Sequence, residues 1–211
     1  MHAAAEQHLI EADRTLGHLI RRVGPCRLEA KSSGDAQGPF IALVEAVAHQ
    51  QLTGKAAATI LGRFRALFPA GRFPRPAQLL AVEEERLRAA GFSRAKIKAL
   101  KDIAAKSIDG TVPSTKAIAR LEDEAIIARL TTIHGVGRWT VEMLLIFHLG
   151  RPDVLPVDDY GVRKGFALTF RRPDLPTKAE ILARGERWRP YRSVASWYLW
   201  RAVDLARASA S

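Results

Sequence analysis

The chain has 211 residues, 47% of them hydrophobic, and its 33 Lys and Arg outnumber its 22 Asp and Glu to give a net charge of +11. This composition excludes an intrinsically disordered chain, and the charge indicates a polyanionic partner, most often nucleic acid, with general solubilising charge as the alternative. The single cysteine, Cys26, excludes an intramolecular disulfide, a cysteine-based zinc site and a four-cysteine iron–sulfur cluster. The first residues carry acids where a signal peptide would have an apolar core, and no apolar run reaches membrane-spanning length. We therefore expect a cytoplasmic protein, nucleoid-associated if bacterial, with no membrane partner.

Helical periodicity runs through almost the whole chain. Apolar residues form a helical stripe over 5–24, and the stretch 39–69 predicts two helices that meet near Leu52 and Gly54. After a loop rich in Pro and Arg at 69–78, a short helix stops at Gly91, and a longer one begins after Ser93 and ends at Gly110. Further helices are predicted within 112–133, where two short ones fit, and within 138–148, 177–190 and 191–208. No series of strands is apparent, so the predicted fold class is all-α, with roughly ten or more short helices.

The segment "IHGVGRWTVEMLLIFHLGRPDVLPVDDYG" (133–161) combines a Gly-Val-Gly turn with two adjacent acids. Two glycines let the backbone approach a ligand closely, and the helix that begins after them offers free N–H groups and the positive end of its dipole. Such a turn suits an anion, and DNA phosphate is the natural anion for a chain this basic. An ordinary glycine-capped connection between two helices is the alternative reading.

This segment, extended to start at "LTT" (130–132), resembles the helix–hairpin–helix and Gly/Pro-Asp signature (HhH-GPD) of the DNA glycosylase superfamily, most closely its 3-methyladenine DNA glycosylase II branch in compact form. "AHQQLTGKAAATI", "LRAAGFSRAKIKALKDIA" and "RWRPYRSVASWYLW" resemble other helices of that branch, so the likeness covers about residues 38–205. The chain departs from the family at His134, where proline is usual. The N-terminal β domain of the long bacterial members is not expected, because helix begins near residue 5.

The resemblance implies one glycosylase domain over 1–211 with a cleft between two lobes, one formed by residues 38–130 and the other by 1–37 with 131–211. It implies hydrolysis of the N-glycosidic bond of alkylated purines of the 3-methyladenine and 7-methylguanine type in duplex DNA. The base would be flipped out of the helix, and an abasic site would remain. Without the resemblance, both Asp158 and Asp159 could simply cap the helix after them; with it, Asp159 is the expected catalytic residue and Asp158 the expected cap.

The resemblance also assigns roles to other residues. The position after the hairpin that holds a Schiff-base lysine in the lyase members is Trp139 here, so no AP-lyase activity is expected. The expected base pocket contains Trp139, Met143 and Trp200, with Trp197 and Tyr198 as weaker candidates that could equally be core. The expected DNA-binding hairpin comprises Ile133, His134, Gly135, Val136, Gly137, Arg138 and Thr140, and phosphate contacts are expected from Arg138, Lys55 and Arg163. The expected wedge is Gln51, with Gln50 and Leu52 beside it, and capping of the helix end is the alternative.

No cofactor is expected to be required, and no zinc-ligand spacing is present. A Na⁺ or K⁺ ion bound by the backbone of Thr131, Ile133 and Val136, with DNA present, is implied by the resemblance. The expected partner is damaged double-stranded DNA, and the protein is expected to be a monomer. Two alternatives stay open: a non-catalytic helix–hairpin–helix DNA-binding protein, and a glycosylase for a deaminated or oxidised base.

Overall fold

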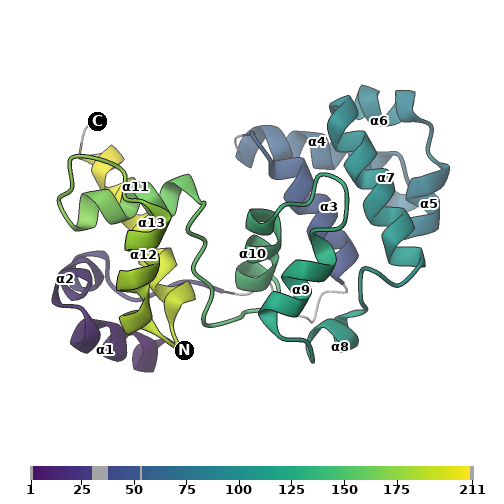
Figure 1. Cartoon of the computed structure of the whole chain (residues 1–211). Coiled ribbons are helices and arrows are strands. Elements are labelled where there is room, and N and C mark those ends of the chain that lie inside the picture. Colours follow the sequence, from purple (N-terminus) through teal and green to yellow (C-terminus); the bar gives the residue numbers. More distant parts are fainter. Residues whose placement is uncertain (1, 30–37, 53, 210–211) are drawn as a thin grey trace. The chain divides into compact units, whose positions relative to one another are not determined.

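The computed structural model describes residues 2–29, 38–52 and 54–209, and within these ranges it contains helices and no strand. The predicted all-α fold class is therefore confirmed (Figure 1). In the described part of the chain, no helix has both the length and the apolar character needed to cross a lipid bilayer.

The described residues form two compact units, one made of 2–29 with 150–209 and the other of 38–52 with 54–149. Residues 131–149, which were expected to join the terminal helices, belong instead to the middle unit. The physical reason is packing: helix α10 (Arg138–Phe147) contacts helices α3 (Pro39–His49) and α9 (Asp123–Leu130), and both of these lie in the middle of the chain. The expected boundary near residue 131 was therefore wrong by one helix.

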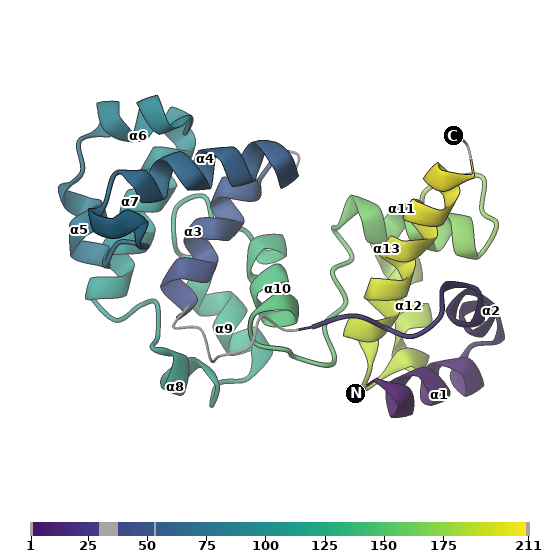
Figure 2. The same ribbon diagram turned by 180° about the vertical axis from the view of Figure 1, so that it is seen from behind.

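The terminal unit brings the two ends of the chain together around one core (Figure 2). Its elements are α1 (Ala3–Ala12), α2 (Arg14–Val23), α11 (Tyr160–Thr169), α12 (Lys178–Gly185), a 3-10 turn η2 (Glu186–Trp188) and α13 (Arg192–Ala208). Leu9, Leu16, Trp188 and Tyr198 are fully buried in it. The stripe at 5–24, expected to be continuous, breaks at Asp13, because that residue is extended and its carboxylate accepts hydrogen bonds from the Thr15 and Leu16 amides that begin α2.

The middle unit packs its helices around Leu43, Phe64, Ile97 and Leu100, all of them buried. Its remaining elements are α4 (Gly54–Ala66), a 3-10 turn η1 (Pro69–Gly71), α5 (Pro76–Ala81), α6 (Glu84–Ala90), α7 (Arg94–Ile108) and α8 (Thr115–Ile118). Gly91 ends α6 with φ 110° and the Ser93 hydroxyl accepts the Lys96 amide to begin α7, as the sequence predicted. Helix α5 lies partly inside the stretch expected to be a loop.

In the terminal unit, α11 and α13 pack against each other so closely that only glycine fits between them (Figures 1 and 2). A Cβ atom at Gly165 would lie 1.9 Å from the carbonyl oxygen of Leu199 on α13, and one at Gly161 would lie 2.7 Å from the Trp200 ring. These glycines are four residues apart and therefore share one face of α11. This glycine face fixes how near the start of α11 comes to Trp200.

We expect Gly165→Ala to lower the free energy of unfolding by about 3 kcal/mol, because the added methyl group would force the two helix backbones apart. Urea and thermal unfolding would measure the loss. Gly62→Ala is the matched control, since Gly62 also lies within a helix but its Cβ would meet open space. That change should stabilise the protein by about 0.5–1 kcal/mol. Similar effects of the two substitutions would contradict the close packing of α11 on α13.

Candidate active site

The loop that precedes the paired acids is anchored to the start of α13. The Arg192 guanidinium binds the Asp153 carboxylate, with Nε 2.6 Å from Oδ1 and a terminal nitrogen 3.0 Å from Oδ2. The Ser193 hydroxyl accepts the Val154 amide at 3.0 Å. Leu155 is buried beside Gly185, whose Cβ would lie 2.4 Å from its side chain. These contacts hold the loop against the terminal unit up to the point where α11 begins.

Asp159 lies at the N-terminus of α11 and is half-buried. Its Oδ1 atom accepts the backbone amide of Val162 at 2.8 Å and the indole Nε1–H of Trp200 at 2.8 Å. The carboxylate is therefore both the cap of α11 and the partner of an aromatic residue from α13. Two donors and the positive end of a helix together hold this group in one orientation.

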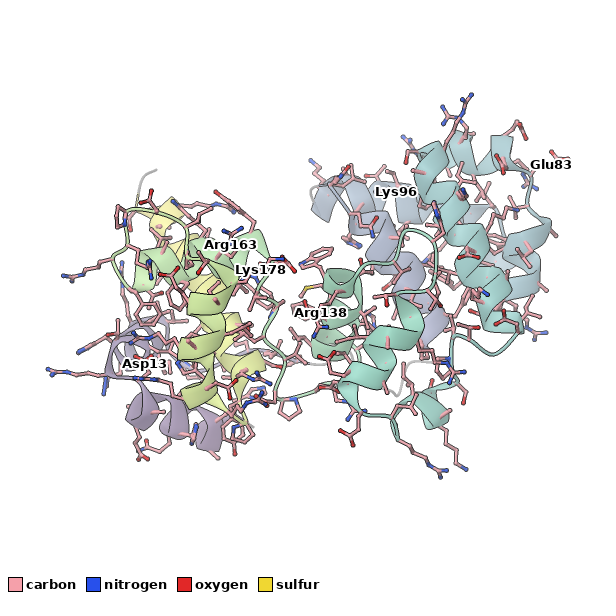
Figure 3. The ribbon with its side chains drawn as sticks, viewed as in Figure 1. Asp13, Glu83, Lys96, Arg138, Arg163 and Lys178 are labelled. Carbon is pink, nitrogen blue, oxygen red and sulfur yellow. The ribbon has the colours of Figure 1, made fainter. Side chains whose placement is uncertain are left out.

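The expected division of roles between the two acids was wrong in one respect. Asp158 was expected to cap α11, but Asp159 is the cap, and the exposed Asp158 forms an ion pair with Lys178 of α12. The helix starts one residue later than expected, so Asp158 lies outside it and points to a neighbouring helix. In the same unit, the Arg163 guanidinium donates to the carbonyl oxygen of Pro176, two residues before Lys178, at 3.0 and 3.2 Å; both side chains are labelled in Figure 3.

Gly161 belongs to this site, although sequence reasoning did not select it. Its missing side chain lets the Trp200 indole approach, since a Cβ would lie 2.7 Å from Trp200 Cδ1 and 3.0 Å from Asp159 Oδ1. The signal was present in the sequence as a Gly-x-x-x-Gly spacing two residues after the second acid. That spacing permits close helix approach but does not say which helix approaches.

The other aromatic residues of α13 turn away from Asp159 into the core. Tyr198 is fully buried, and its one hydroxyl proton lies within reach of two acceptors, Glu6 Oε1 at 3.1 Å and the Gly24 carbonyl oxygen at 3.0 Å. Burial, followed by the nearby charges of Glu6 and Cys26, raises the pKa of Tyr198. Trp197 is 9% exposed and packs edge-on against Tyr198. Of the three aromatic residues, only Trp200 has a hydrogen bond to the candidate catalytic acid among the contacts of the described residues.

The second candidate element, the Gly-Val-Gly hairpin, lies in the middle unit between α9 and α10. Gly135 has φ 76°, and its Cβ would lie 2.8 Å from the Cβ of Ala99 on α7, so both the turn and the packing require glycine. The backbone N–H of His134, which a proline at this position would lack, donates to Asp102 Oδ2 at 2.6 Å. Asp102 on α7 therefore satisfies the backbone donor that the departure from proline introduces.

Several of the expected hairpin residues have buried side chains. Ile133 is 2% exposed, Val136 3% and Thr140 2%, so these three anchor the hairpin from inside, and their side chains are not available to a ligand. Gln50 binds the hairpin through its side-chain amide, which donates to the Gly135 carbonyl oxygen at 3.1 Å and to the Thr140 hydroxyl at 3.2 Å. Any ligand contact at positions 133 and 136 would therefore use backbone atoms.

Arg138, expected to contact phosphate, is held by two carboxylates. Its Nε atom lies 3.0 Å from Glu142 Oε1, and its terminal nitrogens form a second ion pair with Glu124 (Figure 3). Hydrogen bonding to Arg138 lowers the pKa of Glu124. The guanidinium would have to exchange these partners to bind a phosphate. Lys55, the other expected phosphate contact in this unit, is exposed.

The turn between α3 and α4 presents the expected wedge residues at the surface. Gln51 has φ 57°, a left-handed conformation that is strained for a side chain other than glycine, asparagine or aspartate. Gln51 and Leu52 are both exposed, Leu52 by 39%. Lys96 on α7 holds the base of this turn, since its ammonium donates to the carbonyl oxygens of Ala48 at 2.9 Å and Gln50 at 2.8 Å (Figure 3). Burial lowers the pKa of Lys96.

The remaining expected pocket residues, Trp139 and Met143, are half-buried on α10. They are four residues apart and therefore share one face of that helix. His49 is exposed, and its Nδ1 atom lies 2.8 Å from the Glu45 carbonyl oxygen, which ties the ring to the last turn of α3.

Within the described ranges, no group of three or more His, Cys, Asp or Glu side chains could hold a metal ion. The monovalent cation expected at the carbonyl oxygens of Thr131, Ile133 and Val136 stays a prediction. The Ile133 carbonyl accepts the Val136 amide at 3.1 Å and has a second lone pair that could face a cation.

We expect Gly135→Ala to lower the free energy of unfolding by about 1–2 kcal/mol, because alanine is strained at this positive φ and its methyl group would meet Ala99. Hydrogen exchange of the His134 amide, followed by NMR, should become faster as the hairpin loosens. Gly137→Ala is the control, since Gly137 has φ −91° and open space at its Cβ. Equal exchange at His134 in both variants would show that Gly135 does not determine the hairpin conformation.

The comparison with known proteins agrees with this geometry. A model of the HhH-GPD superfamily of base excision DNA repair proteins matches residues 44–190. DNA-3-methyladenine glycosylase 1 of Schizosaccharomyces pombe is 44% identical over 202 residues, which cover 96% of this chain and 88% of that protein. The structure of the S. pombe 3-methyladenine DNA glycosylase in complex with abasic DNA is similar with a TM-score of 0.87 at 43% identity, covering 97% of this chain and 98% of that one. The structure of DNA-3-methyladenine glycosidase from Bacillus halodurans is similar with a TM-score of 0.83 at 33% identity, covering 96% and 91%. The chain therefore belongs to the HhH-GPD superfamily of base excision DNA repair proteins.

Proposed function

We propose that the chain is a monofunctional DNA glycosylase that hydrolyses the N-glycosidic bond of alkylated purines such as 3-methyladenine and 7-methylguanine in duplex DNA. The observation that carries the proposal is the Asp159 carboxylate, held by the N-terminus of α11 and by the Trp200 indole. The names of the S. pombe and B. halodurans relatives support the substrate class. The S. pombe structure contains abasic DNA, the kind of product that such a reaction leaves.

The chemistry follows from a fixed negative charge. Breaking an N-glycosidic bond develops positive charge on the sugar, and a carboxylate that is already oriented stabilises this charge without reorganisation. Asp159 can also orient the water that attacks the sugar. A methylated purine is cationic and leaves readily, so a single acid is sufficient for this class of lesion. The residue after the hairpin Arg138 is Trp139 and not lysine, which supports hydrolysis without a Schiff-base step.

A base that reaches Asp159 would also contact Trp200, because the indole donates a hydrogen bond to the Asp159 carboxylate. An aromatic face attracts a cationic ring, so Trp200 is suited to recognise an alkylated base. Trp139 and Met143, which share one face of α10 in the middle unit, stay predicted base-contacting residues on the family resemblance alone.

The proposed substrate is damaged duplex DNA, bound by a monomer. The hairpin would bind a phosphate through the backbone that Gly135 and Gly137 leave accessible and through the N-terminus of α10. The exposed Gln51 and Leu52 are proposed to occupy the space that the flipped nucleotide leaves. A cytoplasmic location also stays a prediction.

The first test measures release of 3-methyladenine and 7-methylguanine from methylated duplex DNA. We expect release by the wild type and a loss of roughly a hundredfold or more in Asp159→Asn, because the charge that stabilises the sugar cation is removed. Asparagine still accepts the hydrogen bond that caps α11, so the variant should remain folded. Its affinity for DNA, measured by fluorescence anisotropy, should be nearly unchanged.

Asp158→Asn is the matched control, since this neighbouring acid pairs with Lys178 at the surface. It should retain release to within about threefold. Equal release by wild type and Asp159→Asn would move the catalytic role to another residue, Asp158 first. Tight DNA binding without release by the wild type would favour a different lesion or a non-catalytic DNA-binding protein.

A second substitution tests the role of the indole. Trp200→Phe keeps an aromatic ring but removes the indole donor to Asp159, and we expect base release to fall by about tenfold, since the carboxylate loses a hydrogen bond that orients it. Single-turnover rates on duplex DNA containing 7-methylguanine would measure the change. Trp197→Phe, on the same helix but packed in the core, should retain the rate. An equal loss in both variants would indicate a general effect of α13 and not of this hydrogen bond.

A further inference from the structure

The terminal unit contains a cavity of about 900 Å³ that is separate from the site around Asp159. It is formed by α2, the C-terminal ends of α11 and α13, and Arg184 of α12. Asp159 caps the opposite end of α11, and a helix of ten residues is about 15 Å long. The cavity therefore lies a full helix length from the candidate catalytic acid, and nothing in the proposed reaction uses it.

The ionisable side chains that line the cavity are all basic. Four of its side chains are basic, namely His18, Arg22, Arg171 and Arg184, and none of its lining residues is acidic. Arg22 and Arg171 are exposed and form no ion pair with a described residue. Such a concentration of one sign of charge in a concave surface attracts an anionic group.

Apolar side chains form part of the cavity lining, and this part is called the floor below. Leu19 and Leu205 line it, together with Phe170, whose ring lies 3.8 Å from the guanidinium carbon of Arg184. Asp13, which is 2% exposed, accepts both Nε and a terminal nitrogen of Arg184, at 2.7 and 2.9 Å. Burial would raise the pKa of Asp13, but hydrogen bonds from Arg184, the Leu16 amide and Trp188 outweigh it and lower this pKa. Arg184 is therefore neutralised and fixed, and Arg22 and Arg171 remain to attract an anion.

Arg171 holds an unusual position for an arginine. It follows the end of α11 with φ 51°, and the next amide, that of Arg172, returns to the Ala167 carbonyl oxygen at 2.8 Å. This is the left-handed helix ending that glycine adopts most easily. Arginine is strained at this φ, and its side chain lines the cavity.

We propose that this cavity is a docking site for an acidic segment of a partner protein that inserts an apolar side chain against Phe170 and Leu205. The floor suits an apolar anchor, and Arg22 and Arg171 suit carboxylates on either side of it. Duplex DNA fits less well, because its outer surface is convex and carries phosphates without an apolar group to fill the floor. The site is independent of the reaction assigned to Asp159.

Fluorescence anisotropy with a labelled peptide of alternating glutamate and leucine tests the proposal on the full chain. We expect saturable binding that weakens with added salt, since surface charges are screened. Peptides that alternate lysine with leucine, or glutamate with serine, should bind much more weakly, because each lacks one of the two features that the cavity matches. Arg22→Glu should weaken binding of the acidic apolar peptide by about tenfold. Arg21→Glu makes the same charge change on the same helix outside the cavity lining and should have less than about a twofold effect.

In Arg171→Gly, we expect thermal stability and peptide affinity to change in opposite directions. Glycine relieves the left-handed strain, so thermal stability should rise while peptide affinity falls by about threefold or more. Absence of saturable peptide binding at about 1 mM, or equal effects of Arg21→Glu and Arg22→Glu, would overturn the proposal. Displacement of the peptide by duplex DNA, with weaker DNA binding in Arg22→Glu, would also overturn it and assign this surface to DNA.

Discussion

The contact between α11 and α13 is possible only because α11 presents glycine at positions 161 and 165, and the geometry around Asp159 depends on this contact. A side chain at Gly165 would collide with the backbone of α13, and one at Gly161 with the Trp200 indole. The close approach brings a hydrogen-bond donor from one helix to the acid that caps the other. A single backbone-to-backbone contact thus determines both the packing of the terminal unit and the orientation of its carboxylate.

In the middle unit, side chains that bind backbone groups position the candidate functional loops. Its hairpin and its α3–α4 turn are loops, and loops are held in place by contacts from rigid elements. Lys96 and Asp102, both on α7, bind backbone groups of the turn and of the hairpin, and Gln50 joins the two loops. One helix therefore positions the residues proposed to contact phosphate and those proposed to enter the base stack. Preorganisation of this kind spares a ligand the cost of ordering the loops.

The net charge of +11 indicates an anionic partner, but the cations that the sequence singles out are largely occupied. Arg138 is bound by Glu124 and Glu142, and Arg163 by a backbone carbonyl oxygen. The proposed phosphate contact of the hairpin would therefore use backbone N–H groups, which carry no sequence information. This suits an enzyme that must search undamaged DNA. In the cavity of the terminal unit, by contrast, Arg22 and Arg171 form no ion pair with a described residue.

The sequence by itself determined the all-α class, the stop at Gly91, the cap at Ser93 and the glycine turn at 135–137, whereas the expectation that Asp159 is catalytic came from the family resemblance. These features rest on helical periodicity and on local dihedral preferences, which a short stretch of chain expresses alone. Only the tertiary structure decided that Asp159 and not Asp158 caps α11, that Gln50 binds the hairpin, and that α10 joins the middle unit. Three hydrogen bonds that position the candidate site residues join parts of the chain that are far apart in sequence. Asp159 and Trp200 are 41 positions apart, Gln50 and Gly135 are 85 apart, and Asp102 and His134 are 32 apart. Such pairs meet only when whole helices pack, and helix packing depends on the shape of many side chains at once.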